Sequence, residues 1–300
     1  MGYILILLLV VFVAIYSVSL RAFKGITLKR RHTIEENFSS IEKEGLYSKA
    51  EFENLPKEYI ELKSSDGLIL KGIFIEKFKN NKKIIIIVHG YTSNYAWSAQ
   101  FLKMFFKEGF NVLLIDQRSH GTSEGKFATY GYHEKYDLDL WVNWVRAKAG
   151  ENSIIGLHGQ SMGGGTVLEY AGINKYVKFI IADCPYSDAI QLIKHQFNNL
   201  NHIPMIPFIY FTNMRLKWKA RFSLRDVSPI NSIKDKDTPI MFIHGSKDNF
   251  VPTYMSEEMY RVKKGYKKLL IVEGAVHANA YGTNKELYEK EVHNFLEDIL

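Results

Sequence analysis

The stretch IIGLHGQSMGGGT, residues 154–166, restricts the fold of this chain more than any other stretch. An apolar run typical of a buried strand ends at Ser161, which has glycine at 159 and at 163–165. Gly-x-Ser-x-Gly between a strand and a helix forms a sharp turn that projects the serine hydroxyl above a parallel sheet. The stretch therefore predicts Ser161 as a nucleophile, and the alternative is a glycine-rich loop that happens to contain a serine.

The chain beyond residue 57 alternates apolar, strand-like runs with stretches of helical spacing. This alternation predicts one α/β domain over 58–300, with a mostly parallel sheet and helices on both faces. A hairpin with Asp66 and Gly67 in its turn is expected at its start. Residues 184–238 break the rhythm, are rich in aromatic residues and contain Pro204 and Pro207. We expect a lid over a substrate pocket there, and an ordinary crossover helix with a loop is the alternative.

A serine hydroxyl needs a general base before it is nucleophilic at neutral pH. Two later strand-to-loop junctions supply Asp248 and His277, in the order serine, acid, histidine that suits this turn. Asp183, after the preceding strand, is the rival acid. An oxyanion that forms beside the serine needs two donors, and we expect the backbone N–H groups of Met162 and Tyr91 to supply them.

Together with two further motifs, these residues resemble the alpha/beta-hydrolase superfamily over about residues 58–300. The motifs are His89-Gly90 and the stretch DQRSHGTSEG that begins at Asp116. The resemblance is to bacterial serine aminopeptidase-like hydrolases. It implies that His89 and His120 hold loops through hydrogen bonds and that Asp116 ties down the loop around Arg118.

The same resemblance implies hydrolysis of an ester, thioester or peptide bond, with no cofactor and no metal. The aromatic-rich lid and the apolar N-terminal segment suit an apolar acyl group, so we expect a serine hydrolase that cleaves a carboxylic ester or thioester of a small-molecule or lipid-like acyl substrate. A peptidase that acts on short peptides with the same triad stays open. It would need acids near the pocket, for which Glu257 and Glu258 are the candidates. A non-catalytic membrane protein that keeps the fold is a third reading.

Residues 2–20 are uncharged and almost wholly apolar. About 20 such residues in a helix cross the roughly 30 Å hydrocarbon core of a bilayer. Nothing basic precedes the run, so an uncleaved transmembrane anchor over 1–20 is favoured over a cleaved signal peptide. Residues 21–57 are expected to form a juxtamembrane linker or helix.

The formal net charge of +7 is concentrated beside this anchor. Five basic residues precede the first acidic one: Arg21, Lys24, Lys29, Arg30 and Arg31. Such a cluster stays on the cytoplasmic side and attracts anionic headgroups, so we expect a single-pass protein of the cell membrane with a cytoplasmic domain. No nucleic-acid motif is present. The single cysteine, Cys184, excludes an internal disulfide and a metal site built on cysteines.

Overall fold

The structure is a computed structural model that describes residues 2–200 and 206–300. Met1 and residues 201–205 lie outside the described part. Pro204, which was noted in the predicted lid, is therefore not described.

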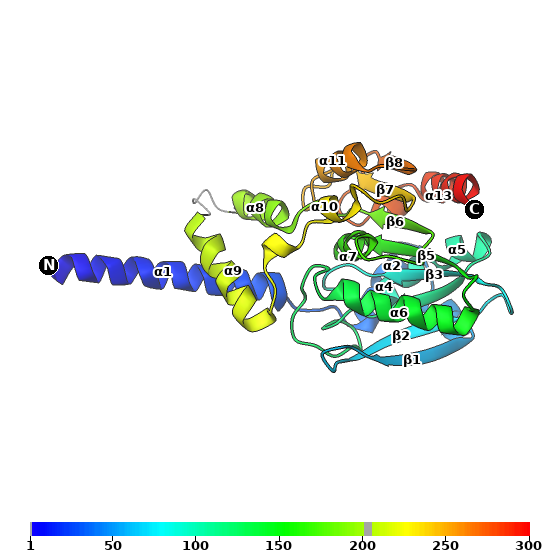
Figure 1. The fold of residues 1–300 in the computed structure, drawn as a ribbon, viewed down its shortest axis with the longest axis horizontal. Coiled ribbons are helices and arrows are strands. Elements are labelled where there is room, and N and C mark those ends of the chain that lie inside the picture. The colour runs from blue at the N-terminus through cyan, green and yellow to red at the C-terminus, as the bar shows by residue number, and fades with distance from the viewer. Residues whose placement is uncertain (1, 201–205) are drawn as a thin grey trace.

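An eight-stranded sheet in the order β1-β2-β4-β3-β5-β6-β7-β8 forms the centre of the molecule (Figure 1). The first two strands form an antiparallel hairpin, with Gly67 at a φ of 91° in its turn, and β2 also pairs antiparallel with β4. All other neighbours are parallel. The predicted hairpin and mostly parallel sheet are confirmed. The strands are β1 (Lys57–Lys63), β2 (Ile69–Ile75), β3 (Lys83–Val88), β4 (Asn111–Ile115), β5 (Ile154–Gln160), β6 (Phe179–Asp183), β7 (Ile240–Gly245) and β8 (Lys267–Val272).

Helices cover both faces of this sheet, which explains why the central strands are nearly continuous apolar runs. One face packs against α2 (Ile34–Lys43), α3 (Lys49–Glu53), α4 (Tyr95–Ser98), α5 (Leu102–Lys107), α12 (Ala280–Thr283) and α13 (Lys285–Ile299). The other packs against α6 (Glu134–Ala149), α7 (Met162–Ala171), α10 (Pro229–Ile233) and α11 (Tyr254–Val262).

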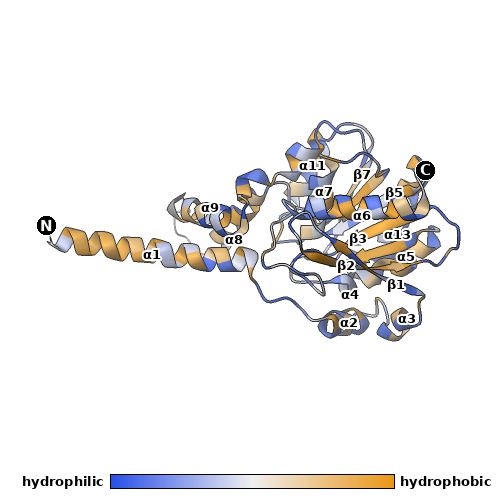
Figure 2. Ribbon diagram, turned by 60° about the horizontal axis from the view of Figure 1, so that its bottom comes forward, coloured by the Kyte–Doolittle hydropathy of each residue, from blue (hydrophilic) through white to orange (hydrophobic). Residues whose placement is uncertain are grey.

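The N-terminal helix α1 (Gly2–Thr27) is longer than the apolar run that predicted it. Its last turns continue because Phe23 and Ile26 are buried against the body of the protein. Its first part projects away from the domain, and residues 3–13 are exposed and apolar (Figures 1 and 2). Within the described residues it is the one helix long and apolar enough to cross a membrane.

The segment after α1 folds onto the sheet. Thr33 and Glu36 form a capping box that starts α2. Phe38 and Ile41 of α2 and Phe52 of α3 are buried in the core on that face. Residues 34–53, expected as a juxtamembrane linker or helix, thus contribute to the core that supports the site.

The lid segment, residues 184–238, forms α8 (Ala189–Leu200), α9 (Ile206–Ala220), a 3₁₀ turn (Leu224–Asp226) and α10. Helix α9 lies beside α1 (Figure 1). Leu192 of α8 and Leu216 of α9 join Phe23 and Ile26 of α1 in a third apolar cluster, separate from the two that cover the sheet.

Candidate active site

Ser161 lies in the sharp turn between β5 and α7. Its φ of 55° lies in the left-handed region, which is strained for a residue with a side chain. A Cβ on Gly159 would lie 2.3 Å from the Gly163 carbonyl oxygen, and one on Gly163 would lie 2.1 Å from the Val88 oxygen. Only glycine fits at either place, which is the physical reason for the motif.

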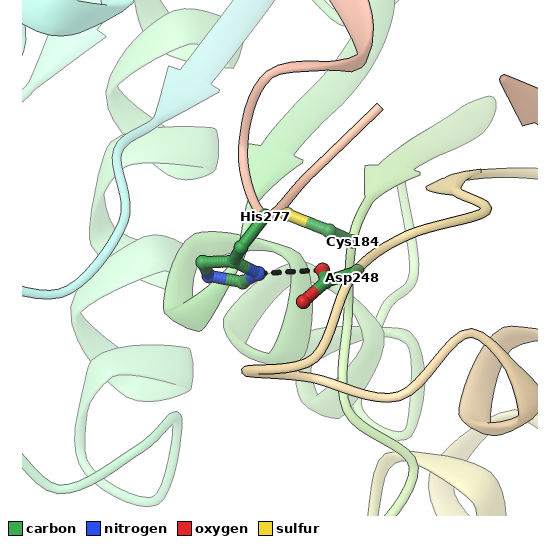
Figure 3. Close-up of side chains that lie close together, drawn as sticks. All are labelled: Cys184, Asp248 and His277. Carbon is green, nitrogen blue, oxygen red and sulfur yellow. Dashed lines mark hydrogen bonds and ion pairs between the residues drawn. The ribbon is translucent and has the colours of Figure 1, made fainter. Parts of the chain in front are cut away.

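The structure brings Ser161, His277 and Asp248 together. His277 follows β8 and Asp248 follows β7, so all three residues come from the carboxyl edge of the sheet. The Ser161 Oγ lies 2.8 Å from His277 Nε2, and His277 Nδ1 lies 2.7 Å from Asp248 Oδ2. Figure 3 shows the contact between His277 and Asp248. A histidine that donates through Nδ1 leaves Nε2 free to accept the serine proton.

Asp248 is buried and held by several donors. Its Oδ1 accepts the N–H groups of Phe250 and Val251, at 2.9 and 2.8 Å. His244 Nε2 lies 3.3 Å from its Oδ2. Burial by itself would raise the pKa of this carboxyl, but the hydrogen bonds from His244, His277 and the Val251 N–H outweigh burial and hold the pKa below its usual value. Asp248 is therefore a carboxylate that can stabilise a protonated His277.

His244 is a contact of the acid that the sequence did not single out. It lies at the end of β7, four residues before Asp248. Its Nδ1 contacts the Ser256 hydroxyl at 2.7 Å and its Nε2 contacts the Val251 carbonyl at 2.8 Å. These contacts fix the ring against Asp248. The four-residue spacing to the acid was the available signal.

Asp183, the rival acid, has other partners. Its Oδ2 accepts from Gln160 Nε2 at 3.0 Å and from the Tyr288 hydroxyl at 3.4 Å. Burial raises the pKa of this carboxyl to about 6. Its backbone oxygen accepts the Ser161 N–H at 2.8 Å. Asp183 therefore supports the turn, and Asp248 is the acid in hydrogen-bond contact with His277.

Cys184 lies behind the pair, and its sulfur is within 4.8 Å of ligand-type atoms of Asp248 and His277 (Figure 3). Thiolate, imidazole and carboxylate groups are also metal ligands. Burial, however, raises the pKa of the Cys184 thiol well above its usual value. A neutral thiol is a weak ligand, and His277 Nδ1 and both Asp248 oxygens already have hydrogen-bond partners. The donor set fits a proton-relay pair better than a metal site.

The two expected oxyanion donors lie on either side of Ser161. Met162 is the first residue of α7, where a backbone N–H has no partner within the helix. Gly90 approaches the serine so closely that a Cβ on it would lie 3.3 Å from the Ser161 Cβ. Tyr91 follows Gly90 directly, and both residues line the same pocket as Ser161.

The loop that contains Tyr91 is joined to the segment after α1. The Tyr91 hydroxyl accepts the Lys29 N–H at 3.2 Å and donates to the Gly25 carbonyl at 3.3 Å. The His32 N–H donates to the Thr92 carbonyl at 2.7 Å. The chain that leaves the apolar helix is thus hydrogen-bonded to the loop beside Ser161.

A pocket of about 190 Å³ opens beside Ser161 and His277. It is lined by residues 90–93, Trp97, Gln160, Ser161, His277 and Ala278, and by His32, Asn37 and Ser40 from the segment after α1. Sequence reasoning missed these last three. The capping box and the spaced apolar residues of α2 were signals that this segment packs as a helix.

The lid's aromatic residues lie elsewhere. Among the described residues, none of them lines the Ser161 pocket. Phe211 and Trp218 instead line a separate apolar cavity against α1. The expectation that they form the wall of the pocket beside the nucleophile is therefore wrong, because α9 turns these side chains toward α1.

The other motif residues hold loops. His89 Nδ1 contacts the Gly90 oxygen at 2.7 Å and its Nε2 accepts the Gln117 N–H at 3.0 Å. Burial lowers its pKa to about 4, so it is neutral. Asp116 accepts the Thr122 N–H at 2.7 Å. Asp116 also accepts the Thr122 hydroxyl at 2.9 Å, so it ties down the loop around Arg118 as expected, while the Arg118 guanidinium itself pairs with the carboxylates at 66 and 137.

Comparison with known proteins agrees with this geometry. The family model described as "Serine aminopeptidase, S33" matches residues 79–204. YqkD of Bacillus subtilis (strain 168) is 34% identical over 250 residues, which cover 83% of this chain and 82% of YqkD. The chain belongs to the alpha/beta-hydrolase superfamily.

Two further alpha/beta-hydrolase comparisons extend this assignment. The esterase Pf2001 of Pyrococcus furiosus has the same fold, with a TM-score of 0.67 and 24% identity over 84% of this chain and 94% of that one. Thiohydrolase aneE of Aspergillus aculeatus is 32% identical over 147 residues, 46% of this chain and 45% of the relative. The family match and the esterase of the same fold together support a hydrolase.

Proposed function

We propose that this hydrolase is a membrane-anchored serine hydrolase that cleaves a carboxylic ester or thioester. The observation that carries the proposal is the hydrogen-bonded chain from Ser161 through His277 to Asp248, with contacts of 2.8 and 2.7 Å. The similarity to an esterase and to a thiohydrolase supports the same class of substrate.

The geometry supports a two-step reaction. His277 Nε2 takes the Ser161 proton while the serine oxygen attacks the carbonyl carbon, and Asp248 stabilises the imidazolium that forms. The N–H groups of Tyr91 and Met162 would stabilise the oxyanion, with one such donor worth about 10²–10³ in rate. The intermediate expels an alcohol or thiol, which receives the proton from His277. Water then attacks the acyl-serine with His277 as base, and the acid product and free Ser161 result.

The pocket favours an ester or thioester over a short peptide. An aminopeptidase needs acids to bind the substrate ammonium group, but the described residues that line the pocket include no Asp or Glu. Neither Glu257 nor Glu258 lines it, and the Glu258 carboxylate accepts the Ser187 hydroxyl instead. The aminopeptidase description of the matching family keeps peptide cleavage as the alternative.

The membrane part of the proposal rests on α1. Its exposed apolar surface and length suit a bilayer, and its basic residues follow the apolar run, which favours a cytoplasmic hydrolase domain in a single-pass protein of the cell membrane. A cleaved signal sequence is the competing assignment for the same helix.

The test compares substrates on the full chain. We expect turnover of p-nitrophenyl esters and acyl thioesters, and loss of that turnover in Ser161→Ala but not in Ser65→Ala, a matched change of an exposed serine in the hairpin turn. Faster turnover of aminoacyl p-nitroanilides would favour the peptidase. Ester turnover that survives in Ser161→Ala would contradict the proposal.

A further inference from the structure

We propose that helix α9 is a second membrane-contacting element, embedded beside α1 in the interface of an anionic bilayer. The inference rests on the anchor in the proposed function. It assigns a role to α9, which belongs to the lid segment and does not line the Ser161 pocket.

The first observation is the depth at which α9 meets α1. An apolar cavity of about 420 Å³ lies between the two helices. Phe12, Ile15 and Tyr16 of α1 line it, together with Phe211, Met214 and Trp218 of α9. The α1 residues belong to the apolar run 2–20, so α9 contacts the part of α1 that is expected inside the membrane.

The length of α1 determines whether α9 can lie outside the bilayer. If α9 lay wholly outside the bilayer, only residues 2–11 would remain for the hydrocarbon core. About ten helical residues span about 15 Å, roughly half the thickness of that core. An α1 that crosses the membrane therefore brings the adjoining face of α9 down to the level of the lipid.

The exposed side of α9 has the composition of an interfacial helix. Tyr210, Met214 and Trp218 recur every four residues, so they share one face, and they are 64%, 54% and 74% exposed. Tryptophan and tyrosine are enriched where hydrocarbon meets headgroups. Met214 and Trp218 also line the cavity against Phe12 and Tyr16, so this exposed face adjoins the exposed apolar surface of α1.

The charges of α9 favour anionic lipid. The helix contains Arg215, Lys217 and Lys219 and no acidic residue. The Arg215 guanidinium lies 4.5 Å from the centre of the Tyr16 ring, and the Lys219 Nζ lies 3.8 Å from that of Trp218. Long basic side chains of this kind extend from an apolar surface to the headgroups. Lipid acyl chains are the occupant that this chemistry assigns to the cavity between α1 and α9.

The experiment measures quenching of tryptophan emission by brominated acyl chains, with the full chain in vesicles of phosphatidylcholine and phosphatidylglycerol. We expect quenching in the wild-type chain and its loss in Trp218→Phe. Trp144→Phe is the matched control, because Trp144 of α6 packs against Phe74 of the sheet, and this variant should keep the quenching. Weaker quenching is expected in phosphatidylcholine alone, and equal quenching in both lipids would contradict the role of the basic residues.

Two negative results have different meanings. Equal quenching in wild type and Trp218→Phe, in chains that float with the vesicles, would overturn the inference and leave the anchor intact. Chains that do not float with the vesicles would overturn both the anchor and the inference. Ester turnover that depends on Ser161 reports on the catalytic part of the proposed function separately from either result.

Discussion

The two walls of the Ser161 pocket are built in different ways. One wall carries Ser161 and His277, which come from turns at the carboxyl edge of the sheet. The other carries His32, Asn37 and Ser40, from the segment that follows the apolar helix. The first wall depends on local turn geometry, whereas the second depends on distant parts of the chain docking together. Substitutions in the first wall are therefore expected to abolish hydrolysis, and substitutions in the second wall are expected to slow it.

The largest effect is expected from Asp248, the buried acid that is hydrogen-bonded to His277 of the first wall. In Asp248→Asn, the amide no longer stabilises a protonated His277, and kcat for ester hydrolysis should fall about 10⁴-fold. Asp183→Asn is the matched control, because burial raises the pKa of Asp183 to about 6 and its side chain accepts from Gln160 and Tyr288 instead of His277. That control should lose less than about tenfold.

Both variants need a thermal unfolding measurement beside the rates, so that a loss of folded protein is not mistaken for a loss of chemistry. Equal losses of kcat in folded Asp248→Asn and Asp183→Asn would contradict the assignment of Asp248 as the acid.

A smaller effect on kcat is expected where the second wall is hydrogen-bonded to the loop that contains Tyr91. Tyr91→Phe removes the hydroxyl contacts with Lys29 and Gly25 but keeps the backbone N–H. Each of the two hydrogen bonds is worth about 1 kcal/mol, so kcat should fall by up to about 30-fold with KM little changed. Tyr59→Phe, on the exposed side of β1, is the control and should have no effect. An unchanged kcat in Tyr91→Phe would show that the segment after α1 does not position the loop.

The difference between the two walls also explains how much of the site could be predicted from the sequence. The glycines around Ser161 are dictated by steric contacts within a few residues, so the motif predicts the turn and its nucleophile. The order of strands then placed Asp248 and His277 at the same edge. The first inference uses local geometry, and the second uses the regular order of strands in a fold of this type.

The second wall could not be predicted in the same way. The stretch that contains Asn37 is polar with spaced apolar residues, which indicates a helix but not the surface it packs on. Burial of Phe38 and Ile41 depends on the sheet face that receives them. The lid aromatics show the same limit, since composition predicted an apolar surface while the fold directs Phe211 and Trp218 toward α1.

Covalent labelling of the full chain with a fluorophosphonate tests the central claim most directly, because this probe reacts with an activated serine. Mass spectrometry should find the adduct on the peptide that contains Ser161. Labelling should be absent in Ser161→Ala and strongly slowed in His277→Ala. Equal labelling of wild type and Ser161→Ala, or folded wild-type protein with no adduct at Ser161, would contradict the account.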